Sequence, residues 1–476
     1  MLRFRGPTLI LLSVLAATGP VRAQQAPSIP SQPWDASLAK QALKAPAPSA
    51  PPLNLDPAKV YTLAELVNIA EQNNPDTRVA WQNAKARASE VGIAQSTLYP
   101  TLAAVALAET TRGDILLDTR YVRQTLDSFA PLLSLDYTIF DFGRRLQEVA
   151  INRNRLLAAN FQFNDTHRKV IFQVMQAYYR LLDAKGLQQA AEANLKNAQT
   201  VQQAAEARLQ NGLATLPDVL EARSAAAQAD YNLQSALGAL EIAHGDLATV
   251  LGISPLTQFQ VQSIQDIKMP DSIEDTVEAS IDKALAQRPD LMQQVAQLRA
   301  AGAEVKAARR NYFPTLNLDG EAGLGRRYGQ QVGFPGVYSP THEVWDARLT
   351  LSWTLFDGLA RENRLAQSHA DQKEAAAAID SIRDQVENQV WAAYSTANTA
   401  LRQQKAAAAL LESATESYNA ALESYNYGVR SQIDVVSAQR TLADARATDV
   451  AARTQLLTGL AALAYQTSDL LYGKRP

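Results

Sequence analysis

The chain has 476 residues and a formal net charge of −3, from 45 basic and 48 acidic residues. This balance argues against a nucleic-acid-binding surface, which needs clustered positive charge. The sequence contains no cysteine, which excludes disulfides, thiolate metal sites and a thiol nucleophile. After the N-terminal region no stretch holds 18 consecutive apolar residues, so we expect no transmembrane helix.

The N-terminal residues are typical of a secretory signal. Two arginines precede an apolar run from Pro7 to Ala17, and residues 21–23 (Val-Arg-Ala) have the small-x-small pattern of a cleavage site. We therefore predict a signal peptide at residues 1–23 and export of the mature protein. Residues 24–60 are rich in Pro, Ala, Ser and Gln, a composition that predicts a flexible arm.

The remaining sequence contains a long internal repeat. Tyr99-Pro100-Thr101-Leu102 recurs as Phe313-Pro314-Thr315-Leu316, and Thr138-Ile139-Phe140-Asp141 recurs as Thr354-Leu355-Phe356-Asp357. The spacing far exceeds the 20–50 residues of solenoid repeats, so it predicts two duplicated halves that share one structure. The predicted segments are a first repeat at 61–251, an inter-repeat linker at 252–270 and a second repeat at 271–476.

Each repeat is expected to begin with two short helices. A capping box at Thr62 starts the first of them. Its counterpart is predicted from Asp271 to the residue before Pro289. The next helix of each repeat, at Asp76–Leu98 and Asp290–Tyr312, is stopped by the proline of the repeated Tyr/Phe-Pro motif.

The hydrophobic period then changes from 3.6 to 2, which predicts four strands. They are expected at Thr101–Glu109, Leu133–Phe140, Leu316–Leu324 and Leu349–Leu355. These lengths approach the roughly 9–11 residues that a tilted strand needs to cross a bilayer. Long polar connections, Thr110–Phe129 and Arg326–Trp345, join the strands of each hairpin, as in outer-membrane barrels. A soluble half-buried sheet is the alternative, and the export signal favours the membrane.

Four strands cannot close a barrel, because about eight are the smallest number that do. An open sheet cannot lie in lipid, because its edge groups would lack hydrogen-bond partners. We therefore expect several copies of the chain to contribute four strands each to one barrel. The pattern does not give the number of copies.

Two long helices follow the strands, at Arg144–Asn211 and Leu359–Tyr427. At ~1.5 Å per residue each could reach about 100 Å. Both end in a glycine turn, at Gly212 and Gly428, and a returning helix follows each turn. The returning helices are predicted at Asp218–Val250 and Asp434–Leu471. Two long antiparallel hairpins of this kind are expected to pack as coiled coils.

The order of these elements resembles the TolC-type outer-membrane efflux channels. The resemblance rests on the Tyr/Phe-Pro-Thr-Leu motif of each repeat, on Phe140-Asp141-Phe142-Gly143-Arg144 and on Phe356-Asp357-Gly358. It implies a fold of α and membrane β-barrel class, in which a homotrimer forms a twelve-stranded barrel continued by a twelve-helix periplasmic α-barrel. The short helices and the linker would form an equatorial belt. The implied location is the outer membrane, extending into the periplasm.

The resemblance implies a passive channel that exports small molecules, with a periplasmic adaptor and an inner-membrane transporter as partners. One alternative is the outer-membrane duct of a type I protein secretion system. Another, from a different class, is a periplasmic coiled-coil adaptor or scaffold. We find no catalytic, metal or phosphate-binding motif, so we expect no enzyme activity and no cofactor. The isolated histidines are His167, His244, His342 and His369.

The hairpin turns hold the candidate functional residues. Asp218 and Asp434 each follow a Thr or Ser by three residues, the spacing of a capping box, so both are expected to cap the returning helices. The resemblance adds a gate: three copies of Asp434 would form a carboxylate ring that favours cations, and Asp218 would pair with Tyr425 and Arg430. The exposed turns are candidates for docking the adaptor, and simple loops are the alternative. Their residues are Gly212, Leu213, Gly428 and Val429.

Overall fold

A computed structural model describes residues 55–472, except residue 118 and residues 332–340. The predicted signal peptide and most of the predicted arm lie outside the described residues. At the described end of the arm Leu55 is buried. Strand β1 (Val60–Tyr61) then pairs in parallel with β4 (Gln260–Val261). This short sheet attaches the start of the first repeat to the linker between the repeats.

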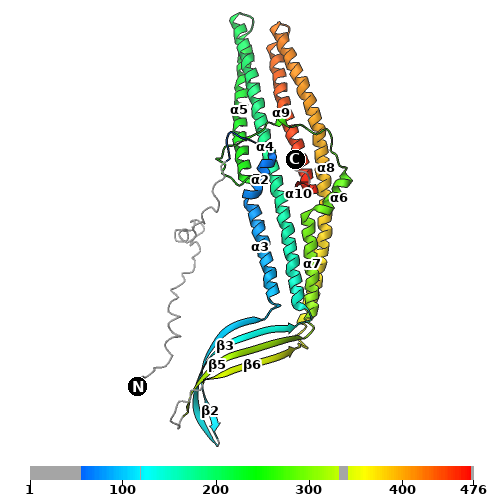
Figure 1. Ribbon diagram of the computed structural model, residues 1–476. Coiled ribbons are helices and arrows are strands. Elements are labelled where there is room, and N and C mark those ends of the chain that lie inside the picture. The colour runs from blue at the N-terminus through cyan, green and yellow to red at the C-terminus, as the bar shows by residue number, and fades with distance from the viewer. Residues whose placement is uncertain (1–54, 118, 332–340, 473–476) are drawn as a thin grey trace, which may run out of the picture. The chain divides into compact units, whose positions relative to one another are not determined.

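The two short helices of each repeat are present (Figure 1). They are α2 (Leu63–Asn73) and α3 (Pro75–Ser96) in the first repeat, and α6 (Val277–Gln287) and α7 (Pro289–Arg310) in the second. The capping box of Thr62 and Glu65 is confirmed. The prediction that α6 begins at Asp271 is wrong. The side-chain oxygen of Thr276 accepts a hydrogen bond from the Ala279 amide at 3.3 Å and caps the helix there.

The four strands form one antiparallel sheet in the order β2-β3-β5-β6 (Figure 1). Their bounds are β2 (Thr101–Leu117), β3 (Arg120–Phe140), β5 (Thr315–Gln331) and β6 (Thr341–Ser352). The hairpins of the two repeats therefore join through β3 and β5. Within the described residues, β2 and β6 each have a strand on one side only. The sheet is open at both edges.

All four strands are longer than expected, and the prediction of a long polar connection at Thr110–Phe129 is wrong. Strands β2 and β3 stay paired as far as Leu117 and Arg120. Asp114 and Arg123 lie opposite each other in the register and form an ion pair at 3.2 Å. Polar residues that resemble a loop in sequence are here cross-strand partners. In the second hairpin β5 extends to Gln331, so the predicted connection there is also shorter.

Strand β6 ends at Ser352 rather than at Leu355. Beyond the end of the strand, the Arg361 guanidinium donates hydrogen bonds to the carbonyl oxygens of Thr354 at 2.7 Å and Leu355 at 3.1 Å. Asp357 holds the same guanidinium at 3.1 Å. The equivalent pair in the first repeat is Asp141 and Arg145, and Arg145 donates to the Thr97 carbonyl. The repeated Phe-Asp motif thus fixes the passage from strand to long helix.

The long helices are α4 (Arg144–Gln210) and α8 (Ala360–Asn426), of 67 residues each. Gly212 and Gly428 follow them with φ angles of +71° and +77°, which glycine adopts without steric cost. The returning helices are α5 (Leu216–Val250), α9 (Gln432–Thr467) and α10 (Asp469–Tyr472). The expected single helix up to Leu471 is interrupted at Ser468, which has a φ angle of +66°. Helix α4 packs against both α5 and α9, so the two hairpins lie side by side (Figure 1).

The largest hydrophobic cluster lies where α4 meets α2, α5, α9 and the linker. Gly186, in the middle of α4, permits this packing, because a Cβ there would lie 2.7 Å from Cγ1 of Val450. The linker contributes the buried side chains of Phe259, Val261 and Ile264. Among the described helices, none is both long enough and apolar enough to span a membrane.

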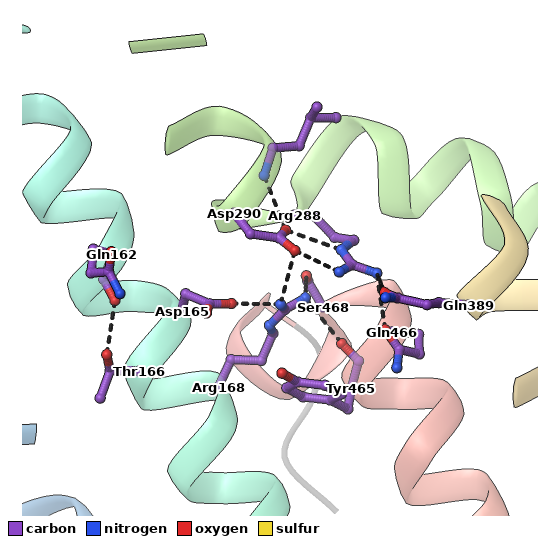
Figure 2. A network of polar contacts seen from close by, with 11 residues as sticks. Gln162, Asp165, Thr166, Arg168, Arg288, Asp290, Gln389, Tyr465, Gln466 and Ser468 are labelled. Atoms are coloured by element: carbon purple, nitrogen blue, oxygen red, sulfur yellow. Dashed lines mark hydrogen bonds and ion pairs between the residues drawn. The ribbon is translucent and has the colours of Figure 1, made fainter. Parts of the chain in front are cut away.

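A buried polar network beside this cluster ties the two repeats together (Figure 2). Arg168 of α4 is only 1% exposed. It pairs with Asp165, lies 3.7 Å from Asp290 of α7, and donates to Oγ of Ser468 at 3.2 Å. Arg288 approaches Asp290 from the other side. Arg288 also donates to the side chains of Gln389 and Gln466, each at 2.9 Å.

Candidate functional site

The two hairpin turns carry exposed apolar side chains beside their glycines. Leu213 and Val429 occupy equivalent positions after Gly212 and Gly428, and both are exposed. In each turn the amide of this residue donates to a carbonyl five residues back, on Arg208 or Ser424. These bonds satisfy carbonyls at the end of the long helix. The turns are therefore well-formed structures that present an apolar side chain to the surroundings.

Asp218 and Asp434 complete the capping boxes of the returning helices, as predicted, but these helices begin two residues earlier than expected, at Leu216 and Gln432. The Asp218 carboxylate accepts hydrogen bonds from the amide and hydroxyl of Thr215, at 2.8 and 2.6 Å. The Asp434 carboxylate accepts the same pair of bonds from Ser431, at 3.0 and 2.8 Å. The hydroxyl and amide bonds lower the pKa of both carboxyl groups. Each tip therefore carries an ionised carboxylate near neutral pH.

The structure places Tyr425 and Arg430 in different surroundings. Tyr425 is 5% exposed, and burial is the main cause that raises the pKa of its hydroxyl. Arg430 is exposed, and its charge helps to lower the pKa of Asp434. In the part of the chain described, neither residue hydrogen-bonds to Asp218, although the Asp218 charge acts on Tyr425. The closing network of Asp218, Tyr425 and Arg430 stays a prediction.

Sequence reasoning missed Arg208, which lies against Tyr425. The guanidinium carbon is 4.4 Å from the centroid of the Tyr425 ring, and Nη1 donates to the Tyr425 carbonyl at 2.7 Å. A comparison of the two repeats could have indicated this contact. With the offset of 216 residues, Arg208 corresponds to Ser424 and Tyr425 corresponds to Leu209. Both partners of the contact are thus positions where the two repeats differ.

A small hydrophobic cluster joins the two hairpins near the tips. It takes Val201, Ala205, Val219 and Ala222 from the first hairpin and Ala414, Tyr418, Tyr425, Val435, Leu442 and Ala445 from the second. Four of these side chains are alanines, which allow helices to approach closely. Farther from the turns, Arg446 of α9 donates to the side-chain oxygen of Asn194 on α4 at 2.8 Å.

The chemistry of this site is that of an electrostatic surface. Over the described residues, no group of three or more His, Asp or Glu side chains is placed to hold a metal ion. Asp218, Asp434 and Arg430 instead put charges beside the exposed turns. A groove of about 470 Å³ lies between α4, α5 and α9, lined mainly by Ala, Gln, Asn and Ser side chains. The charges beside the turns can attract ions.

Comparison with known proteins identifies relatives along most of the chain. A family model described as "Outer membrane efflux protein" matches residues 66–253 and 280–466, one match in each repeat. Protein CyaE of Bordetella pertussis is 28% identical over 347 residues, which cover 71% of this chain and 70% of CyaE. The alkaline protease secretion protein AprF of Pseudomonas aeruginosa is 25% identical over 425 residues, covering 84% of this chain and 82% of AprF.

The fold also matches solved structures. A membrane protein from Pseudomonas aeruginosa superposes with a TM-score of 0.75 at 23% identity. The match covers 89% of this chain and 98% of that protein. At this identity the likeness shows a common fold, and it spans both the sheet and the long hairpins.

Proposed function

The chain belongs to the outer membrane efflux protein family, and from this premise we propose that three copies assemble into one continuous export duct. The family resemblance expected from the repeated motifs is confirmed. The protein is thus a passive efflux channel rather than an enzyme, located in the outer membrane and extending into the periplasm. The trimer, the closed barrel and the gate are the proposed parts of this function.

The open sheet is the observation that carries the trimer proposal. Strands β2 and β6 leave edges that would lack hydrogen-bond partners in lipid. If β2 of one copy pairs with β6 of the next, three copies give twelve strands, above the roughly eight that close a barrel. The strands contain 12 to 21 residues, more than the roughly 9–11 that a bilayer requires.

The proposal is tested by purifying the protein from outer-membrane fractions and measuring its oligomeric state and its conductance in planar bilayers. A trimer with stable conductance is the expected result. Cysteines placed on facing residues of β2 and β6 should form disulfides between copies, which is a clean readout because the chain has no native cysteine. A monomer without conductance would contradict the channel assembly.

The hairpin tips are proposed as the periplasmic gate. In a threefold assembly, Asp434 would occur three times around the axis. Ionised carboxylates in such a ring attract cations, and the lowered pKa of Asp434 keeps it charged. This part of the proposal includes the pairing of Asp218 with Tyr425 and Arg430.

The partners are proposed to be a periplasmic adaptor and an inner-membrane transporter, since a passive duct needs an energised pump. Leu213 and Val429, with Gly212 and Gly428, give each copy two exposed apolar turns for adaptor docking. Exported small molecules are the first proposal for the substrate. Secretion of a protein is the second, favoured by the likeness to AprF, whose name records protease secretion. Deleting the gene and scoring toxic-compound sensitivity and secreted proteins separates the two.

A further inference from the structure

The sheet of a single copy contains a junction between the two repeats. At this junction β3, the last strand of the first repeat, pairs with β5, the first strand of the second. The counterpart of β3 is β6, at an offset of 216 residues, and the counterpart of β5 is β2, at an offset of 214 residues. If β6 of one copy pairs with β2 of the next, the residue pairs between β3 and β5 predict the residue pairs between copies.

Transfer of this register places an arginine opposite a glutamate. Leu132 and Gly323 lie opposite each other within the copy, and their counterparts are Arg348 of β6 and Glu109 of β2. Both counterparts are exposed on edge strands. Within the copy the Arg348 guanidinium donates to Asp346, two residues away on its own strand, at 3.1 Å. Opposite charges that face each other across two strands stabilise the pairing of those strands.

The same transfer places an aromatic ring beside a guanidinium. Phe129 lies opposite Arg326 in the junction within the copy. Their counterparts are Trp345, which is 76% exposed, and Arg112, which is also exposed. A guanidinium beside an aromatic ring is favourable, so both junctions gain a residue pair of the same kind.

Two exposed apolar side chains also correspond to a pair inside the copy. Phe140 lies opposite Leu316 in the register of β3 and β5. Their counterparts are Phe356, which follows the end of β6, and Leu102, which lies near the start of β2. Phe356 is 79% exposed and Leu102 is 72% exposed. The transferred register brings these two side chains together where the sheet meets the helices.

The helices next to the sheet show the same correspondence. Gln293 of α7 donates to Gln162 of α4 at 2.9 Å within the copy. The counterparts are Val79 of α3 and Ala378 of α8, so an apolar pair replaces a polar one. Val79 is 69% exposed, and α3 also exposes 68% of Ile93, whose counterpart on α7 packs against α4. Helix α8 of the neighbouring copy would cover both side chains.

We infer that the internal repeat sets the register in which the copies join, and that Arg348 of one copy pairs with Glu109 of the next. The inference rests on the trimer proposed above and adds the residues that select its register. The partner that fits this surface is a second copy of the chain, because the edges of β2 and β6 complement each other in charge, in aromatic pairs and in apolar side chains.

A slip of two residues is the competing arrangement, because it keeps every side chain on its own face of the sheet. A slip in one direction would place Asp346 opposite Glu109, which brings two carboxylates together. A slip in the other direction would place Thr350 opposite Glu109. The transferred register gives Glu109 a partner of opposite charge, and neither slip does.

Over the described length of β6 the transferred register contains one pair of like charges, Glu343 opposite Asp114. Asp114 already has a cation, because Arg123 of β3 lies 3.2 Å from its carboxylate. The ion pair with Arg123 offsets the repulsion from Glu343.

Disulfide crosslinking of the full-length chain tests the register. Leu349→Cys should link to Ala108→Cys, the residue opposite it, and the controls combine Leu349→Cys with Ala106→Cys or Thr110→Cys. Opposite residues have Cβ atoms about 4.5–5.5 Å apart and diagonal ones roughly 7–8 Å, whereas a disulfide needs about 3.5–4.5 Å. Because β3 and β5 separate the two edges of one copy, each link must join two copies. Covalent trimers on non-reducing gels are expected with Ala108→Cys and should be scarce with the controls.

A charge swap tests the ion pair itself. Arg348→Glu places two carboxylates opposite each other at every junction between copies, so the temperature at which the trimer dissociates in detergent should fall. Addition of Glu109→Arg should restore most of that loss, because it reverses the pair. The matched control adds Asp136→Arg instead and should restore nothing, since Asp136 belongs to β3, which has a strand on each side.

Other results would overturn the inference. Stronger links through Ala106→Cys or Thr110→Cys than through Ala108→Cys would contradict the transferred register. Failure of Glu109→Arg to restore the loss, or equal recovery with Asp136→Arg, would contradict the ion pair. In each case a wild type that forms conducting trimers leaves the proposed channel intact. A wild type that forms no trimers contradicts the channel assembly and, with it, this register.

Discussion

The middle of the helical hairpins and their tips both use arginine, in opposite ways. In the middle, Arg168 is fully buried among carboxylates and hydrogen-bond acceptors from α4, α7 and the end of α9 (Figure 2). At the tips, Arg208 is half-buried and contacts the ring face and the carbonyl of Tyr425. A buried charge with several partners is costly to break, whereas the tip contact is marginal. The comparison indicates that the hairpins are held more firmly in the middle than at the tips.

The largest effect is expected from Arg168→Ala. Removing it leaves Asp165 and Asp290 without their shared cation and should lower the free energy of unfolding by about 3–5 kcal/mol. Thermal or denaturant unfolding in detergent measures the change. Arg223→Ala is the surface control, because the Arg223 side chain is 61% exposed. Its effect should stay within about 0.5 kcal/mol. Equal effects of the two variants would contradict the conclusion that the buried network stabilises the fold more than an exposed ion pair does.

Two glycines with almost the same φ angle provide a second test of the difference between the middle of the hairpins and their tips. Gly252, after α5, has a φ angle of +72°, and a Cβ there would lie 2.8 Å from the carbonyl oxygen of Asn73. Gly212, at the tip, has a φ angle of +71° and open space around it. Gly212→Ala should cost about 1–2 kcal/mol for the left-handed conformation alone. Gly252→Ala should cost more, since the backbone of Asn73 must also move.

The buried polar network around Arg168 and Asp290 also predicts that the stability of the protein depends on pH. Burial opposes ionisation of Asp290, but hydrogen bonds and charge from Arg288, with help from Arg168, lower its pKa overall. A lowered folded-state pKa contributes stability above the ordinary aspartate value of about 3.9, and the contribution is lost as the pH falls through the lowered value. The stability difference between wild type and Asp290→Asn should therefore be full at neutral pH and shrink below about pH 4. A difference that grows on acidification would contradict this assignment.

The smallest effect on stability is expected at Asp434, where function should change instead. Asp434→Ala removes an exposed carboxylate from the proposed ring, so block of the conductance by divalent or trivalent cations from the periplasmic side should weaken. Asp444, an acidic residue on the same helix about three turns away, provides the matched control through Asp444→Ala. Block that is unchanged in Asp434→Ala, or equally weakened in both variants, would remove the ring hypothesis.

The sequence predicted those features that depend on local signals. Capping boxes marked the starts of the returning helices, and prolines marked the ends of the short ones. The strand ends were missed because charged residues such as Asp114 and Arg123 look like a loop until their cross-strand pairing is known. Arg168 and Arg208 were also missed. Helix α4 contains seven arginines, and no local pattern distinguishes an arginine that faces another helix from one that faces water.

The equal length of α4 and α8, 67 residues each, limits how this gene can change. One helical turn added to a single repeat would displace its tip by about 5.4 Å along the axis and carry Arg208 past Tyr425. A lone insertion would leave the entrance uneven, with one hairpin of every copy protruding beyond the other. Length changes in these helices should therefore survive in evolution only as matched pairs, one in each half. The length of the long helix in one repeat thus constrains the length of the long helix in the other.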